Sequence, residues 1–282
     1  MGSENWWLLV LFLGLVTACG PGLAEEEQFR LGQQYEDGRG VPQDQERALE
    51  WYRSSAGKGH PGAQIRLGVI YDEGIGVPQD SRQAIEWWRM AAEGGDGEGQ
   101  TRLGRLYSQG TGLPQDKKQA AEWFRKAAQQ GHAAGQYHLA LMYTAGDGVA
   151  QDLRQGLEWH HKAAEQGHAG AQTELGQIYR DGLGVPQDRQ QGIEWYRKAA
   201  AQGHDEARRE LGNMHFNSGL MYAKGDGVLE DRREAAKWYR KAAELGHTEA
   251  QKRLSDMYLV GEGVPQDEVK AAEWLRKANE QR

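Results

Sequence analysis

One segment of this chain recurs along almost its whole length. A leucine recurs every 36 residues in the first five copies, at Leu31, Leu67, Leu103, Leu139 and Leu175. A tryptophan keeps the same interval and then, after a shift of seven residues, recurs twice more; these residues are Trp51, Trp87, Trp123, Trp159, Trp195, Trp238 and Trp274. Such a period is typical of arrays whose units stack on one another. The sequence therefore predicts seven copies of one unit, the sixth lengthened by seven residues.

The first half of each unit has the apolar spacing of an amphipathic helix, which we call helix A. In the fifth copy, small or apolar residues lie at i, i+4, i+7 and i+8, at Ala171, Leu175, Ile178 and Tyr179. Gly182 and Gly184, followed by Pro186, end this helix. Glycine adopts left-handed backbone angles at little cost, and proline cannot continue a helix.

A second helix, helix B, is predicted to begin after Asp188. Gln191 lies three residues later and completes an Asp variant of the capping box. The predicted buried stripe of helix B is Ile193, Trp195, Tyr196, Ala199 and Ala200. Two short amphipathic helices cannot bury their apolar faces alone, so neighbouring copies must stack. The predicted fold class is all-α, a right-handed α/α solenoid of helix-turn-helix repeats.

Residues 1–24 lie outside the predicted repeat domain, residues 25–282. An apolar run of eleven residues, Trp6–Val16, is too short to span a bilayer but suits the core of a signal peptide. The small residues after it end at Cys19 and resemble the lipobox of bacterial lipoproteins, whose cysteine is lipidated. One feature opposes export, because the first five residues carry Glu4 and no basic residue.

Three outcomes remain open for this segment. Lipidation at Cys19 is favoured first, cleavage after Ala24 second, and an uncleaved anchor third. The predicted location is the periplasmic side of a bacterial membrane as a lipoprotein, or secreted or periplasmic if the chain is cut after Ala24. A membrane would then be contacted only through the lipid or the signal anchor.

The charge of the chain argues against nucleic acid as a partner. The sequence has 34 Lys and Arg against 41 Asp and Glu, a net charge of −7. Nucleic-acid binding depends on a concentrated positive field. Cys19 is the only cysteine, so the array contains no disulfide and no cysteine nucleophile.

The sixth copy contains an apparent tandem duplication of seven residues, Leu211–Asn217 followed by Ser218–Lys224. Seven residues at about 100° each leave a phase error of only about 20°. Helix A of this copy is therefore predicted to lengthen by two turns, about 10 Å, with its apolar stripe intact. The competing prediction is a helix broken near Asn217.

The recurring residues form a pattern that runs from Ala171-Gln172-x-x-Leu175-Gly176-x-x-Tyr179 through Gly182-x-Gly184-Val185-Pro186 to Glu194-Trp195-Tyr196. Over residues 27–282 this pattern resembles the Sel-one-like repeat (SLR) family, a relative of the tetratricopeptide repeat. The resemblance implies an adaptor that holds protein complexes together. A cysteine-rich branch of the family is credited with binding or hydrolysing penicillin-type compounds, but the repeats here contain no cysteine pairs.

No catalytic, metal or cofactor site is predicted. Five histidines each follow a glycine at the start of helix A and are interpreted as turn and capping residues; they are His60, His132, His168, His204 and His247. His160 and His161 are adjacent and point about 100° apart on a helix, which disfavours a shared metal. Ser55-x-x-Lys58 matches the S-x-x-K motif of penicillin-interacting enzymes, but the S-D-N and K-T-G motifs that accompany it are absent.

The candidate partner-binding face lies on helix A, opposite Leu175 and Tyr179. The resemblance to tetratricopeptide solenoids places this side on the concave surface. Positions 173, 177 and 180 and their equivalents change from copy to copy, as a specificity surface does. The candidate residues are Phe29, Ile65, Val69, Arg105, Tyr137, Leu141 and Arg180. Their apolar members beside an arginine would suit a peptide or a partner helix.

Three functions follow from these observations. The first is a non-enzymatic scaffold or adaptor of the bacterial cell envelope that binds other proteins or peptides. The second is a peptidoglycan- or carbohydrate-binding envelope protein, which needs convergent carboxylates or aromatic rings on the concave face. The third is a hydrolase of the penicillin-binding or β-lactamase type.

Overall fold

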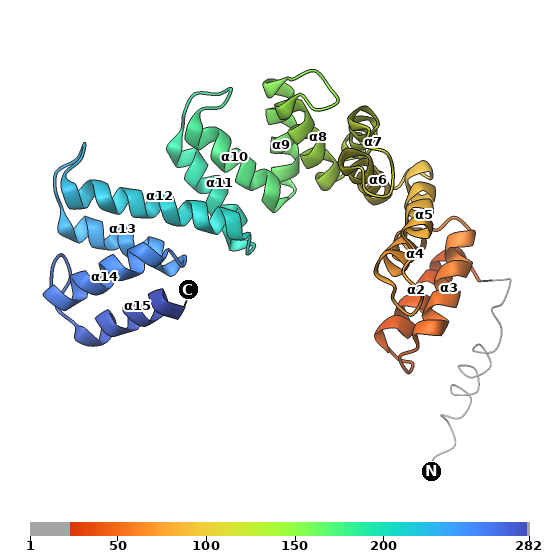
Figure 1. Cartoon of the computed structure of the whole chain (residues 1–282), viewed down its shortest axis with the longest axis horizontal. Coiled ribbons are helices and arrows are strands. Elements are labelled where there is room, and N and C mark those ends of the chain that lie inside the picture. The colour runs from red at the N-terminus through yellow and green to blue at the C-terminus, as the bar shows by residue number, and fades with distance from the viewer. Residues whose placement is uncertain (1–22, 281–282) are drawn as a thin grey trace, which may run out of the picture. The chain divides into compact units, whose positions relative to one another are not determined.

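The computed structural model describes residues 23–280, so Cys19 and the rest of residues 1–22 of the predicted signal segment lie outside the described residues. Over that range the chain forms fourteen α-helices and no strand (Figure 1). None of these helices combines the length and the apolarity that crossing a membrane requires. The described residues fall into two compact units, one ending at Gln151 and the other beginning at Asp152.

Helices A and B alternate along the chain, as the sequence predicts. The A helices are α2 (Glu25–Asp37), α4 (Pro61–Glu73), α6 (Gly97–Gln109), α8 (Ala133–Ala145), α10 (Ala169–Asp181), α12 (Asp205–Lys224) and α14 (Thr248–Val260). The B helices are α3 (Gln45–Gly57), α5 (Ser81–Glu93), α7 (Lys117–Gln129), α9 (Leu153–Glu165), α11 (Arg189–Ala201), α13 (Arg232–Glu244) and α15 (Glu268–Glu280). Within each unit every helix packs on the next. This arrangement confirms the all-α class and an α-solenoid of helical hairpins.

The predicted caps delimit these helices. Before α5, the Asp80 carboxylate accepts the backbone N–H groups of Arg82 and Gln83. The Gln83 amide donates to the other carboxylate oxygen of Asp80 at 3.0 Å, whereas in a standard capping box it would reach the backbone. These hydrogen bonds, led by the Gln83 N–H, lower the pKa of Asp80. At the end of α10, Gly182 has φ 71°, a left-handed angle that glycine adopts without strain.

A glycine of helix A lets an aromatic ring of helix B lie directly on the helix backbone. Tyr196 is 1% exposed and sits against Gly176. A Cβ at position 176 would lie 2.7 Å from Tyr196 Cδ1, closer than real contacts allow. The same close approach recurs in four other copies: Gly32 with Tyr52, Gly68 with Trp88, Gly104 with Phe124, and Gly219 with Tyr239. Each of these glycine–aromatic pairs therefore fixes how closely its two helices pack.

The recurring tryptophan is less buried than predicted. In copies two to seven it is half-buried, and only Trp51, 7% exposed, is buried. The prediction that Trp195 is buried is wrong because the next residue, Tyr196, occupies the position that faces helix A. Lys198 Nζ instead lies 3.9 Å from the centre of the Trp195 ring, a cation–π contact on the outer side of α11.

A buried glutamine links five of the A helices to the preceding helix B. Gln172 is 5% exposed, and its amide donates to the Ala164 carbonyl oxygen at 3.0 Å. The same bond, between residues eight apart, recurs for Gln64, Gln100, Gln136 and Gln251. The sequence pattern contains this glutamine, but its polarity gives no sign of a core position.

Helix α12 is continuous from Asp205 to Lys224, 20 residues against 13 in each of the other helices (Figure 1). This confirms the predicted lengthening and excludes the alternative break near Asn217. The helix packs against its neighbours in two registers, one that follows the 36-residue spacing and one shifted by seven residues. Ala207 and Leu211 pack against α11, as their equivalents 36 residues earlier predict. Phe216 packs against α13, seven residues later than that register would place it.

Candidate functional site

The predicted binding surface is reduced in the structure to what we call the helix-A face, formed by Ile65, Val69, Arg105, Tyr137 and Leu141 in the first unit. These residues come from α4, α6 and α8, and α6 packs against both of its helix-A neighbours. Arg105 is exposed, whereas the four apolar residues are half-buried. Ile65 and Val69 also pack against the core. The face therefore offers a charged group between shallow apolar surfaces.

Phe29, Thr101 and Thr173 belong instead to the joints between copies, whereas Ile65 and Tyr137, at the same position of copies two and four, stay on the helix-A face. The Phe29 ring stacks on His60, with 4.5 Å between ring centres. At the equivalent position Thr173 is 6% exposed, and its hydroxyl lies 3.0 Å from His204 Nδ1. The prediction that position 173 lies on the partner-binding face is therefore wrong for Thr173, because the first turn of the next helix A covers this residue.

Arg180 lies in the second unit, where acidic groups of the chain hold it. Its guanidinium pairs with Asp181 at 2.7 Å and with Glu210 of α12 at 2.6 Å. The hydrogen bond to Asp181 is the largest cause of a raised Arg180 pKa. The first unit has the same bridge with the charges exchanged, between Glu36 and Arg66. Arg180 thus links successive A helices, and its charge is already compensated.

The Ser55-x-x-Lys58 motif has a structural role. Ser55 is fully buried, and its hydroxyl donates to the Glu25 carbonyl oxygen at 2.6 Å. Lys58 Nζ donates to the Leu23 carbonyl oxygen at 2.5 Å. Both side chains fasten the start of α2, so Ser55 is not placed to attack a substrate.

The recurring histidines cap helix A, as predicted. His168 Nδ1 accepts the Ala171 N–H at 3.1 Å, and His60, His132 and His247 make the same bond. His204 makes no such bond and contacts Thr173. Between residues 23 and 280, no three His, Cys, Asp or Glu side chains come together in a way that could hold a metal.

The pair His160 and His161 is divided between core and surface. His160 is fully buried, and burial lowers its pKa to about 4. His161 Nε2 lies 3.0 Å from the Tyr179 hydroxyl, and burial lowers its pKa as well. The two rings therefore have separate environments and do not form a common site.

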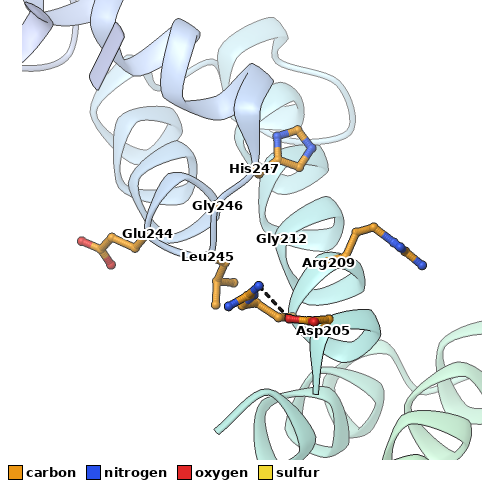
Figure 2. Close-up of a pocket in the computed structure, with 8 residues that line it drawn as sticks. Asp205, Arg209, Gly212, Glu244, Leu245, Gly246 and His247 are labelled. Atoms are coloured by element: carbon orange, nitrogen blue, oxygen red, sulfur yellow. Dashed lines mark hydrogen bonds and ion pairs between the residues drawn. The ribbon is translucent and has the colours of Figure 1, made fainter. Parts of the chain in front are cut away.

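The insertion in the sixth copy creates a pocket that the sequence analysis did not predict. The pocket has a volume of about 570 Å³ and lies between the first turns of α12 and the α13–α14 turn (Figure 2). It is lined by Asp205, Arg208, Arg209, Gly212, Glu244, Leu245, Gly246 and His247. We call it the step pocket. The only sequence signal for it was the duplicated segment.

The two registers of α12 explain the step pocket. At three other joints the residue at this repeat position, Phe29, Thr101 or Thr173, contacts the next histidine cap. The residue 36 positions after Thr173 is Arg209. In the sixth copy Phe216 makes that contact, with 4.4 Å between its ring centre and that of His247. Arg209 lies two helical turns before Phe216 on α12 and is exposed. At the other joints described above, the next copy covers this position. In the sixth copy the seven inserted residues leave it uncovered, and the step pocket lies there.

Fold and surfaces together define a solenoid of helical hairpins, an architecture that mediates contacts between proteins. The family model of the Sel1 repeat matches residues 28–60, 61–96, 97–132, 133–168, 169–204, 206–247 and 248–282. The chain belongs to the Sel1 repeat family. Proteins of this family generally mediate protein–protein interactions.

Solved structures include similar chains from two bacteria. A Sel1 repeat protein from Oxalobacter formigenes is 37% identical, with a TM-score of 0.67 over 92% of this chain and 74% of that one. A protective antigen of uropathogenic Escherichia coli strains, displaying an SLR fold, is 34% identical, with a TM-score of 0.45 over 91% of this chain and 69% of that one. No curated protein matches the chain.

Proposed function

We propose that this chain is a non-enzymatic scaffold of the bacterial cell envelope that binds a protein or peptide through the helix-A face. The observation that carries the proposal is the exposed guanidinium of Arg105 on α6, between half-buried Ile65 and Val69 on α4 and Tyr137 and Leu141 on α8. An amphipathic segment fits such a face, with apolar side chains on either side and an acidic group at the centre.

The envelope location rests on the sequence. Cys19 follows an apolar run of signal-peptide length and resembles a lipobox cysteine. The similarity to a chain from Oxalobacter formigenes supports a bacterial setting. Lipidation at Cys19 would anchor the repeats outside the cytoplasm, and cleavage after Ala24 would release them there.

The location is tested by fractionating cells that produce the full chain or its Cys19→Ser variant. Lipidation predicts that the full chain sediments with membranes and that the variant does not. A full chain found entirely in the cytoplasm contradicts the envelope proposal. A Cys19→Ser chain that stays on the membrane supports an uncleaved anchor instead.

The binding face is tested by combining Arg105→Glu with Tyr137→Ala and recovering partners by affinity purification. We expect the recovered partners to fall by at least about tenfold, because the variant reverses the central charge and removes an apolar contact. Full recovery of every partner would refute the role of this face. The peptidoglycan- or carbohydrate-binding alternative stays a prediction.

A further inference from the structure

The step pocket contains a capping histidine, His247, and two of its counterparts in other copies, His60 and His132, pair with a carboxylate. His60 Nε2 lies 2.8 Å from the Glu26 carboxylate, and His132 Nε2 lies 3.5 Å from that of Glu98. In both cases the glutamate precedes the histidine by 34 residues. The residue 34 positions before His247 is Asn213. Among the described residues no carboxylate pairs with His247, so this cap lacks the partner that His60 and His132 have.

The proton of His247 is positioned to be donated. His247 Nδ1 accepts the Ala250 N–H at 3.1 Å, so the neutral ring carries its proton on Nε2. Burial lowers the pKa of His247, which favours this neutral form near pH 7. Stacking on Phe216 holds the ring in place. The Nε2–H is therefore a fixed donor.

The step pocket also holds one uncompensated arginine. Arg208 pairs with Asp205 at 2.7 Å, the interaction dashed in Figure 2. No described carboxylate forms an ion pair with its neighbour Arg209. Figure 2 shows Arg209 and His247 projecting to the same side of α12, while Glu244 projects to the opposite side. Two donors that pair with no carboxylate between residues 23 and 280 thus line the pocket.

From this arrangement we propose that the step pocket binds a peptide segment through a single carboxylate next to an apolar side chain. The carboxylate accepts hydrogen bonds from the Arg209 guanidinium and from His247 Nε2–H, a charge-assisted arrangement. The apolar side chain lies on Leu245, where Gly212 and Gly246 leave room. Asp205 and Glu244 at the rim oppose a run of several acidic residues. This site lies in the second unit and does not depend on the helix-A face.

The proposal is tested with the full chain and a fluorescein-labelled peptide, Ala-Leu-Glu-Leu-Ala, blocked at its C-terminus as the amide. Fluorescence anisotropy gives the affinity, and the same peptide with Gln in place of Glu is the matched ligand. We expect the Glu peptide to bind at least about tenfold more tightly, because only a carboxylate pairs with the guanidinium. Equal affinities, or no binding of the Glu peptide at millimolar concentration, overturn the proposal.

Variants assign the binding to this pocket. Arg209→Glu is expected to weaken binding of the Glu peptide by at least about tenfold through charge reversal. His247→Asn keeps a residue that caps helices well but removes the imidazole donor, so we expect a several-fold loss with the helix content unchanged by circular dichroism. Arg189→Glu makes the same charge change outside the pocket and should leave the affinity unchanged. If Arg189→Glu weakens binding as much as Arg209→Glu does, attraction is non-specific and the site is refuted.

Discussion

The recurring glycine of helix A is needed for packing at Gly176 but not at its equivalent, Gly212. Gly176 has no room for a methyl group because Tyr196 lies against its backbone. Gly212 arose from the duplicated segment, and a Cβ there would lie 3.5 Å from its nearest neighbour, His247 Cβ, an ordinary contact distance. Both glycines lie inside helices with ordinary helical backbone angles. The same substitution should therefore have opposite effects at the two positions.

We expect Gly176→Ala to destabilise the chain by about 1–3 kcal/mol, because the methyl group forces Tyr196 away from the helix. Gly212→Ala should stabilise it by about 0.5–1 kcal/mol through the higher helix propensity of alanine. Urea unfolding of the two variants beside the parent chain measures both changes. A stabilising Gly176→Ala would show that the ring does not pack on the backbone as described.

Buried histidines predict how stability depends on pH. Burial lowers the pKa of His215 to about 4, against about 6.5 in the unfolded chain. Below pH 6.5 the unfolded state therefore takes up a proton that the folded state does not, so stability is complete above pH 6.5 and falls as the pH drops toward 4. His160 acts in the same sense. The capping aspartates have lowered pKa values, and their contribution is lost only below their usual value of 3.8.

The His215→Gln variant isolates this effect. Glutamine occupies the equivalent position 43 residues earlier, as Gln172, and it does not titrate. We expect the loss of melting temperature between pH 7 and pH 4.5 to be smaller in the variant than in the parent chain. Equal losses in the two proteins would mean that His215 titrates normally in the folded state.

Among the elements, successive A helices are joined by ion pairs whose direction is reversed between the two units. Arg180 and Glu210 form one pair, with 26% of each side chain exposed. Glu36 and Arg66 form the other. Since the same joint accepts either direction, the exchange of both charges should be tolerated while a single exchange should not.

We expect Arg180→Glu alone to cost about 1–2 kcal/mol, because it places a negative charge beside Glu210 and Asp181 in a half-buried site. Adding Glu210→Arg should recover most of that loss by recreating the arrangement of Glu36 and Arg66. A double-mutant cycle in urea measures the coupling. If the double variant is no more stable than the single one, the bridge contributes nothing.

Helix α12 predicts the result of removing its extra turns. Deleting Leu211–Asn217 restores a 36-residue copy with a phase error of only about 20°, so the helix content and a cooperative melting transition should remain. The control deletion, Asn213 and Met214, rotates the rest of the stripe by about 200° and should destabilise the second unit strongly. Circular dichroism during heating compares the two deletions. Equal destabilisation would contradict the two-register description of α12.

At the scale of the whole molecule, periodicity predicts the fold almost completely. Spacing of apolar residues, Gly-Pro stops and Asp caps predict every helix, and the phase of the insertion predicts the long α12. Periodicity gives no information about how deeply a side chain is buried. It therefore predicts a buried Trp195, which is half-buried, and it does not predict that Gln172 is buried. A recurring residue shows that it packs, but only the structure shows which of two adjacent aromatic residues faces the neighbouring helix.

The candidate sites are less accessible to prediction because they depend on contacts between copies. Thr173 and Phe29 vary between copies, as surface residues do, yet the next copy covers them. Arg180 has the charge of a ligand-binding residue, but it is paired within the chain. The step pocket arises from a mismatch between two registers of one helix, a feature that no single repeat contains.

The recurring residues stabilise the solenoid, and the helix-A face, whose residues change from copy to copy, is proposed to bind the partner. Site-specific photocrosslinking in producing cells tests whether this face binds the partner. A photoreactive phenylalanine analogue is placed at Val69 or Leu141 on the helix-A face. The control position is Met90 on α5, which is 45% exposed. We expect a discrete crosslinked product at Val69 and Leu141 that Arg105→Glu abolishes, and none at Met90. The same product at all three positions, or a product at Met90 alone, would contradict it.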